Sequence, residues 1–248
     1  DVCLLYGVTG ATAEKLARAR MASWKDVAAA DPDRLATASG LKEEKARSVW
    51  LHAQAWATGK PQVRQPPTFP AGVPIHFYDI ETYEGCTYLH GDVRVCGGER
   101  EEKQFLARDP SKEGDAWHGF LDYLARDKHA VVYCWATYEY RFVKRLGEKY
   151  GGNADGRRSL EGMKDQCAFI QEHFALPVSS YGIKSVAPVF DFHWKAEDAG
   201  GLNSESWYRD WIEKGDEAIL RKILRYNLDD VRAMEVIDRA LRDFCRRT

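Results

Sequence analysis

Two carboxylates placed two residues apart are the feature of this sequence whose spacing most directly suggests chemistry. Residues 73–82 are largely apolar until they reach Asp79 and Glu81. Side chains of a β-strand alternate between its two faces, so these two carboxylates point the same way. Adjacent carboxylates on an apolar wall are unfavourable unless a positive group lies between them. A divalent metal ion bound by oxygen ligands is the simplest such group, and the strand therefore predicts part of a metal site.

The C-terminal segment supplies another carboxylate at helical spacing. Along residues 216–244, apolar side chains recur at three- and four-residue steps and define one face of a long helix. Asp230 lies on this apolar stripe, and Tyr226 lies one turn before it on the same side. Asp229 points to another face, where we expect it to be exposed to solvent or to support the site indirectly. One bound metal ion would satisfy the aspartate on the stripe and both carboxylates of the strand.

Glu139 is a candidate for the remaining acid. Residues 130–135 predict a short buried strand, and residues 138–146 predict a helix that follows it at once. Glu139 would then lie in the first turn of a helix at the end of a central strand, where ligands gather in open α/β sheets. The alternative is that Glu139 only complements the helix dipole. Asp165, in a segment of mixed character, is the other candidate for a fourth ligand.

The elements between these acids predict an α/β fold. Loosely alternating residues on either side of Gly91-Asp92 predict two strands joined by a hairpin-like break, and residues 102–106 predict a third. Residues 111–126 carry apolar side chains at helical spacing, and residues 151–158 predict a loop. Antiparallel strands, a helix and a strand parallel to the first together predict an α/β layout in which helices flank a mixed sheet.

The first 60 residues predict a small all-α domain. Two helix–glycine turn–helix units about 30 residues apart suggest an internal duplication. Four prolines and two glycines within residues 59–72 exclude a regular helix and indicate a semi-extended linker. We therefore expect a helical domain at 1–60, a linker at 61–72 and a second domain at 73–248.

The composition excludes several classes of protein. The formal net charge is −2, with 10 Lys/Arg against 7 Asp/Glu in residues 1–64 and 26 against 31 in the remainder, so no global basic field indicates nucleic acid. Six scattered cysteines without a C-x-x-C pair argue against a zinc ribbon and a compact disulfide framework. Reduced thiols in a cytoplasmic protein are the expectation.

Neither a membrane span nor a signal peptide is visible in the sequence, and no membrane partner is expected. The chain opens with Asp rather than Met, and we therefore expect a piece of a longer protein.

The N-terminal helices resemble a tandem helix-hairpin-helix module. In that module, glycine turns expose backbone N–H groups to a DNA phosphate. The family turn usually carries glycine, an apolar residue and glycine, whereas Thr9 and Lys42 stand at the second glycine positions here. The alternative is a small helical spacer that packs on its neighbour. The nucleic-acid-binding residues that the resemblance implies are Gly7, Gly10, Lys15, Gly40 and Lys42.

The second domain resembles the DEDD exonuclease group of the RNase H-like superfamily. Residues 77–81 resemble its first motif, and residues 226–230 resemble the last motif of its tyrosine subtype. More closely, residues 74–243 resemble the RNase H-like domain of YprB-type and RecB-family-associated nucleases. A run like residues 133–139 supplies the middle acid in that family, which is Glu139 here although most such exonucleases have Asp.

The resemblance implies a two-metal mechanism. Two Mg²⁺ or Mn²⁺ ions would bind the scissile phosphate. Asp79 would bridge both ions, while Glu81 and Asp230 would complete the site of the ion that activates water. Glu139 would steady the second ion, and Tyr226 would orient the attacking water.

These features predict a metal-dependent 3′–5′ exonuclease that acts on single-stranded ends, with DNA favoured over RNA as the partner. Lys184 is a candidate contact to a substrate phosphate, with a solvated lysine as the alternative. The other functions that fit are a structure-selective endonuclease or ribonuclease with the same site, and a non-catalytic nucleic-acid-binding module of a larger repair or defence protein. In YprB-type and RecB-family-associated nucleases, the RNase H-like domain is often flanked by a RecB/Cas4-like nuclease domain and sometimes by a helicase domain. The resemblance implies such flanking domains in the full-length protein.

Overall fold

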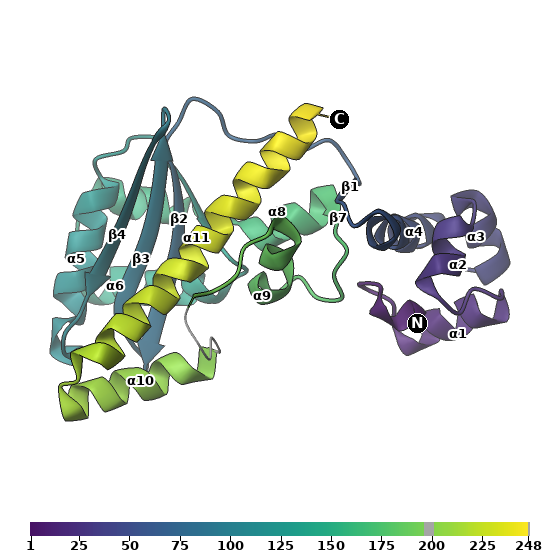
Figure 1. Cartoon of the computed structure of the whole chain (residues 1–248). Helices are drawn as coiled ribbons and strands as arrows, with labels where there is room; N and C mark the ends of the chain where they lie inside the picture. Colours follow the sequence, from purple (N-terminus) through teal and green to yellow (C-terminus); the bar gives the residue numbers. More distant parts are fainter. Residues whose placement is uncertain (196–200, 248) are drawn as a thin grey trace. The chain divides into compact units, whose positions relative to one another are not determined.

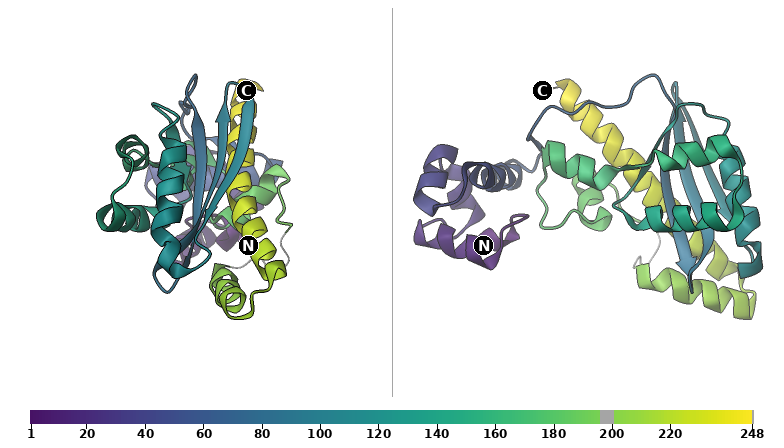
Figure 2. Two further views of the ribbon diagram at one scale, coloured as in Figure 1. Left: turned by 90° about the vertical axis from the view of Figure 1, so that its left-hand side faces the viewer. Right: turned by 180° about the vertical axis from the view of Figure 1, so that it is seen from behind.

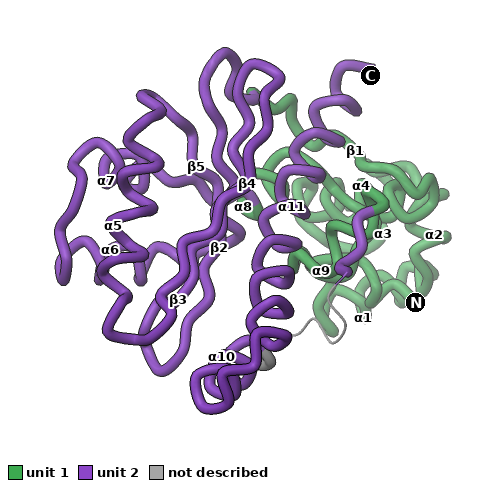
Figure 3. Tube along the Cα trace, turned by 60° about the vertical axis from the view of Figure 1, so that its left-hand side comes forward, with its two compact units in different colours: residues 1–68, 167–191 green, residues 69–166, 192–248 purple. Residues whose placement is uncertain are grey.

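The computed structural model describes residues 1–195 and 201–247 and divides the chain into two compact units (Figure 3). Residues 167–191 belong to the first unit, although the sequence assigned them to the second predicted domain. The predicted domain boundaries themselves stay a prediction. Unit 1 comprises Asp1–Thr68 and Cys167–Asp191, and unit 2 comprises Phe69–Gln166 and Phe192–Thr248.

A mixed five-stranded sheet forms the centre of unit 2 (Figure 1). Its strands are β2 (Ile75–Tyr83), β3 (Cys86–Cys96), β4 (Glu99–Leu106), β5 (Val131–Cys134) and β6 (Lys164–Asp165). The strand order is β4-β3-β2-β5-β6. β3 pairs antiparallel with β2 and β4, whereas β5 pairs parallel with β2 and β6. The predicted mixed sheet, with antiparallel strands followed by a parallel strand, is confirmed.

The predicted hairpin break at Gly91-Asp92 is wrong. β3 continues through both residues, and Gly91 lies opposite Asp79 of β2. The chain turns instead between β2 and β3 at Glu84-Gly85, and between β3 and β4 at Gly97-Gly98. All four of these turn residues have positive φ, a conformation that glycine adopts without a steric penalty.

Helices cover both faces of the sheet (Figure 2). One face carries α5 (Glu113–Leu124), α6 (Tyr138–Tyr150) and α7 (Ala154–Glu161), and the other carries α11 (Glu217–Arg247), with α10 (Gly201–Lys214) packed against α11 and β2. The helices predicted at 111–126, 138–146 and 216–244 are thereby confirmed. Among the described residues, none of these helices has the length and apolar character that crossing a membrane requires.

The predicted loop at 151–158 is wrong in its second half, because α7 begins at Ala154. The side chain of Asn153 caps this helix by accepting hydrogen bonds from the backbone of Asp155 and Gly156. A Cβ atom at Gly156 would lie 2.2 Å from the carbonyl oxygen of Leu121 in α5. The glycine that looked like a helix breaker therefore permits two helices to approach closely.

The pleat of β2 separates its core residues from its acids. Tyr78 and Ile80 enter an apolar cluster with Trp117 and Phe120 of α5, in which all four side chains are buried. Burial of each such large apolar side chain contributes about 1.5–3 kcal/mol. The alternate residues of β2 face α11, and Asp79 is among them. The apolar cluster thus fixes which face of β2 carries the carboxylates.

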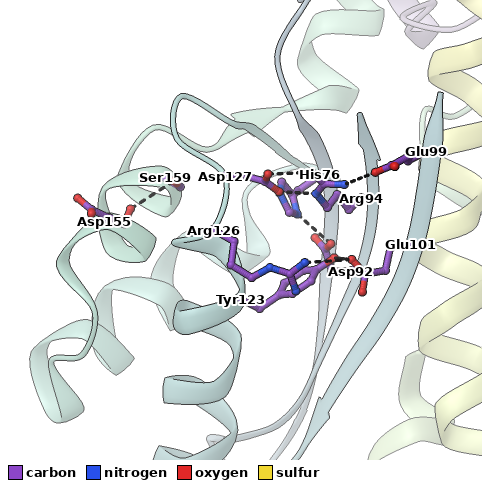
Figure 4. A network of polar contacts seen from close by, with 10 residues as sticks. All are labelled: His76, Asp92, Arg94, Glu99, Glu101, Tyr123, Arg126, Asp127, Asp155 and Ser159. Atoms are coloured by element: carbon purple, nitrogen blue, oxygen red, sulfur yellow. Dashed lines mark hydrogen bonds and ion pairs between the residues drawn. The ribbon is translucent and has the colours of Figure 1, made fainter. Parts of the chain in front are cut away.

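A buried polar network lies on the α5 side of the same strand (Figure 4). The His76 ring donates through Nδ1 to Asp92 (2.9 Å) and through Nε2 to Asp127 (3.1 Å). Arg94 binds Asp127 through two nitrogens. Burial opposes a charged His76, but the two carboxylates prevail and raise the pKa of His76. An imidazolium between two acids therefore joins β2, β3 and the segment after α5.

Unit 1 contains the N-terminal helices and a short two-stranded sheet. Its helical elements are η1 (Val2–Leu4), α1 (Gly10–Arg18), α2 (Trp24–Ala29), α3 (Pro32–Ser39), α4 (Glu43–Thr58), α8 (Gln166–His173), α9 (Ile183–Val186) and η3 (Ala187–Phe190). The strands β1 (Gln62–Val63) and β7 (Phe174–Ala175) pair antiparallel. β1 therefore pairs residues of the predicted linker with the 167–191 segment.

The two glycine turns of unit 1 are tied to each other by lysines. Lys45 of α4 donates to the carbonyl oxygen of Gly7 (2.5 Å), and Lys15 of α1 donates to that of Gly40 (3.5 Å). Gly7 and Gly40 both have positive φ. These crossed contacts fit the internal duplication predicted from the sequence.

Candidate active site

Three of the predicted acids meet between β2 and α11. Asp79, Glu81 and Asp230 each offer a carboxylate oxygen, and these oxygens all lie within 4.8 Å of one another. Glu81 and Asp230 are buried, and Asp79 is half-buried. Asp79 and Glu81 lie on one face of β2, and Asp230 lies on the apolar stripe of α11. Both placements agree with the strand and helix periodicities of the sequence.

Mutual repulsion dominates the electrostatics of this cluster. Burial and the like charges of Glu81, Asp230 and Glu139 raise the pKa of Asp79 well above its ordinary value. A hydrogen bond from Asn227 opposes this effect only in part. The cluster therefore carries more negative charge than its protein surroundings neutralise, which is the condition that a bound cation relieves.

Asn227 fixes the carboxylate of Asp79. Its Nδ2 donates to Oδ2 of Asp79 (2.9 Å), and its Oδ1 accepts from Nε2 of Gln104 (2.9 Å). Gly91 makes room for this amide, because a Cβ atom there would lie 2.0 Å from Oδ1 of Asn227. Sequence reasoning missed all three residues. A glycine inside an alternating strand pattern is the one signal that could have indicated a close approach.

Asp230 is held by an indole. Nε1 of Trp194 donates to Oδ1 of Asp230 at 2.6 Å. The preceding helical turn places Tyr226 near the same carboxylate, and the ring of Tyr226 meets that of Trp207 edge-on at 5.9 Å. Burial and the charges of Asp230 and Glu81 raise the pKa of Tyr226, so its phenol stays protonated. Trp194 lies in an irregular segment, and no sequence pattern identified its role.

Asp229 is buried, so the expectation that it could be exposed to solvent is wrong. Its Oδ2 accepts from the backbone N–H of Lys195 (2.9 Å), and its Oδ1 accepts from Arg232 (3.3 Å). The first of these bonds attaches Lys195, the residue after Trp194, to α11. Asp229 thereby supports the contact between Trp194 and Asp230.

Glu139 lies in the first turn of α6, as predicted, and its side chain is buried. Burial together with the charges of Asp165 and Asp230 raises the pKa of Glu139 to about 7. Among the described residues, its Oε2 has no hydrogen-bond partner. A buried carboxylate oxygen without a partner is costly, and a metal ion would supply one.

Asp165 lies close enough to Glu139 for its charge to raise the pKa of that residue, and its role as an alternative fourth ligand stays a prediction. Its Oδ1 accepts from the backbone N–H of Ala136 at 3.0 Å. Ala136 has a φ of 66°, which is strained for a residue with a Cβ atom. Asp165 thus secures the turn between β5 and α6, and this turn positions Glu139.

The predicted nucleic-acid-binding residues all belong to unit 1. Lys42 is exposed and is the N-cap of α4, where its side chain makes no capping hydrogen bond, and Gly10 is the first residue of α1. Lys184 lies half-buried in α9. The side chain of Thr9 caps α1 by accepting from the backbone N–H of Thr12. The first turn therefore uses one of its N–H groups internally, whereas the second turn has no such side-chain cap.

The donor set fits a hard divalent cation. Asp79, Glu81 and Asp230 offer only oxygen atoms. Glu139 is not one of these three, and its Oε2, which has no hydrogen-bond partner among the described residues, is a separate candidate ligand. Mg²⁺ and Mn²⁺ prefer such ligands. Clustered acids of this kind are typical of enzymes that use metal ions to cleave phosphate esters.

A comparison with protein families identifies the class more closely. The RNase_H_2 family model, described as RNase_H superfamily, matches residues 76–242. The match covers more than half of the chain, and the chain belongs to the RNase H superfamily. No curated protein and no solved structure matches the chain. Membership suggests a nuclease-type phosphodiester hydrolase with a nucleic-acid substrate, in a fold that generally uses divalent metals.

Proposed function

We propose that this protein is a divalent-metal-dependent nuclease that removes nucleotides from the 3′ end of single-stranded DNA. The observation that carries the proposal is the convergence of Asp79, Glu81 and Asp230 within 4.8 Å. The superfamily supports nucleic acid as the substrate. Tyr226 lies four residues, or one helical turn, before Asp230, and this spacing supports the tyrosine type of DEDD exonuclease.

The roles of the side chains follow from their surroundings. Two ions such as Mg²⁺ or Mn²⁺ would supply Lewis acidity and lower the pKa of water. Asp79, Glu81, Glu139 and Asp230 would hold them. Tyr226 stays protonated because its pKa is raised, so its phenol would orient water through a hydrogen bond and would not act as a base.

Two further side chains would keep these ligands in place. Asn227 donates to Asp79 at 2.9 Å, and Trp194 donates to Asp230 at 2.6 Å. Contacts of this kind orient metal ligands, and their loss typically costs about 10–100-fold in metal affinity or activity.

We also propose that the glycine turns of unit 1 bind nucleic acid in the manner of a helix-hairpin-helix module. The candidates are Gly7, Gly10, Lys15, Gly40, Lys42 and, from α9, Lys184. The uncapped start of α4 beside Lys42 supports the second turn, because its N–H groups and helix dipole attract anions.

The test of the catalytic proposal uses Asp79→Asn and Asp230→Asn, which keep side-chain shape and remove charge. A 5′-labelled DNA strand incubated with Mg²⁺ or Mn²⁺ should shorten from its 3′ end with the parent protein and stay intact with both variants. Asp115→Asn is the control, because Asp115 is an exposed acid of α5 whose side chain is 73% accessible. Equal cleavage by the parent and both site variants would refute the proposal.

Two further substrates decide between exonuclease and endonuclease and between DNA and RNA. A circular single strand has no end, so it should persist, and its cleavage would replace the exonuclease with an endonuclease. An RNA strand of the same sequence should be cut more slowly than DNA, and the reverse preference would identify a ribonuclease.

A further inference from the structure

A groove with a cavity volume of about 710 Å³ lies along α4 in unit 1. One wall is a face of α4 that extends from Lys42 to Leu51. The opposite wall is formed by Arg64 and Gln65, which follow β1, and by Gln171 and Glu172 of α8. The basic residues that line the groove are Lys42, Lys45, Arg47 and Arg64, and the acidic residues are Glu44 and Glu172.

The basic side chains of this groove are not neutralised by the described part of the protein. None of the four lies within 4.0 Å of a carboxylate oxygen in residues 1–195 and 201–247. Lys45 donates to a neutral backbone carbonyl, that of Gly7. Glu172 accepts from the neutral amide of Gln65 at 2.8 Å, and Glu44 is exposed. The groove therefore keeps a net positive charge.

The half-buried side chain of Arg64 is held in the groove by three hydrogen bonds. Its guanidinium donates to the carbonyl oxygen of Phe174 (3.3 Å), to Oγ of Ser48 (3.0 Å) and to Nε2 of His52 (2.6 Å). All three acceptors are neutral. A guanidinium has five N–H groups, so two remain for a ligand.

His52 is a neutral hydrogen-bond acceptor for the guanidinium of Arg64. Burial and the nearby Arg64 lower the pKa of His52 to about 4, so the ring is neutral at physiological pH. Its Nδ1 donates to the carbonyl oxygen of Leu176 at 3.2 Å, which leaves Nε2 as the acceptor for Arg64. Such a fixed, uncompensated guanidinium suits the paired oxygens of a phosphate group.

We propose that this groove binds the phosphodiester backbone of a single-stranded nucleic acid, with Arg64 and Arg47 as its principal contacts. Lys42, the N-cap of α4, and Arg47 are five residues apart, about 7.5 Å along the helix axis, so the cations extend over more than one phosphate group. The choice of a nucleic-acid strand rests on the proposed nuclease function. The contacts come from side chains on the flank of α4 and after β1, and not from the backbone of the glycine turns.

Binding of a fluorescein-labelled DNA strand by the full chain tests this inference. Anisotropy is measured in EDTA with Asp79→Asn as the parent, so that cleavage does not interfere. Arg47→Ala should raise Kd by about threefold to tenfold and reduce the salt dependence by about one charge. Arg64→Lys should also raise Kd, because lysine keeps the positive charge but lacks the planar guanidinium that can donate two parallel hydrogen bonds to a phosphate. Arg18→Ala is the matched control, because Arg18 lies in unit 1 outside the groove and its side chain is 81% accessible.

The decisive comparison is between Arg47→Ala and the Arg18→Ala control, because Arg47 is exposed and its side chain makes no hydrogen bond or ion pair with residues 1–195 and 201–247. Equal Kd values and salt slopes for Arg47→Ala, Arg64→Lys and the control would overturn the proposal. Inorganic phosphate that protects the protein from thermal unfolding through Arg64, without any effect of these variants on strand binding, would overturn it too. Since binding is scored without metal and cleavage is scored separately, this proposal and the nuclease assignment can fail independently.

Discussion

Gly91→Ala should disturb the candidate site through a single methyl group. The added Cβ atom would lie 2.0 Å from Oδ1 and 2.7 Å from Cγ of Asn227. Asn227 is fully buried, so its amide has no solvent to move into. It must abandon its hydrogen bonds with Asp79 and Gln104, and Asp79 then loses the donor that favours its charged form.

The expected cost follows from three effects. Overpacking costs about 1–3 kcal/mol. Leaving the buried amide of Asn227 without partners costs about 1–3 kcal/mol more. Replacement of glycine restricts the unfolded chain and returns about 0.4–1 kcal/mol. The net decrease in the free energy of unfolding is therefore about 1–5 kcal/mol. Mn²⁺ affinity should fall by about 10–100-fold, because Asp79 is no longer oriented.

A double-mutant cycle isolates the clash. In an Asn227→Ala background the obstacle is absent, so Gly91→Ala should cost little, and the coupling energy should be about 1–3 kcal/mol. Urea unfolding measures the stability and calorimetric titration measures Mn²⁺ binding. Gly10→Ala is the glycine control, because a Cβ atom there would meet nothing within 4 Å. Additive costs for Gly91→Ala and Asn227→Ala, or unchanged Mn²⁺ affinity in Gly91→Ala, would refute this reasoning.

Three other changes have defined outcomes. The pKa of His76 is raised in the folded state, so the stabilisation that protonated His76 provides is fully present below the unfolded-state pKa of about 6.5. This stabilisation is lost as pH rises through the folded-state pKa. In urea titrations, His76→Gln should therefore reduce the fall in the free energy of unfolding above neutral pH. A fall of the same size in that variant would contradict this. Trp194→Phe removes the donor to Asp230 and should weaken Mn²⁺ binding about 10–100-fold in calorimetry, whereas equal affinity would count against a positioning role. Ala136→Gly relieves the strain of a φ of 66° and should increase the free energy of unfolding by about 0.5–1 kcal/mol in urea titrations, and a decrease would show that the residue is unstrained.

The sequence alone predicted the acids because their pattern is local. The two-residue alternation of a strand places Asp79 and Glu81 on one face, and the helical period places Tyr226 and Asp230 on one stripe. Both periods follow from backbone geometry and need no information about distant residues. The same reasoning predicted Glu139 in the first turn of its helix, and the structure places it there.

The tertiary structure decided which distant residues meet. Asn227 contacts Asp79 across 148 positions, and Trp194 contacts Asp230 across 36, and neither distance leaves a periodic trace in the sequence. Gly91 and Gly156 looked like a turn and a loop because glycine is common in both, yet each is required by the close approach of another element. Backbone periodicity determines the face on which a side chain lies, but only the packing of β2 against α11 determines what that face meets.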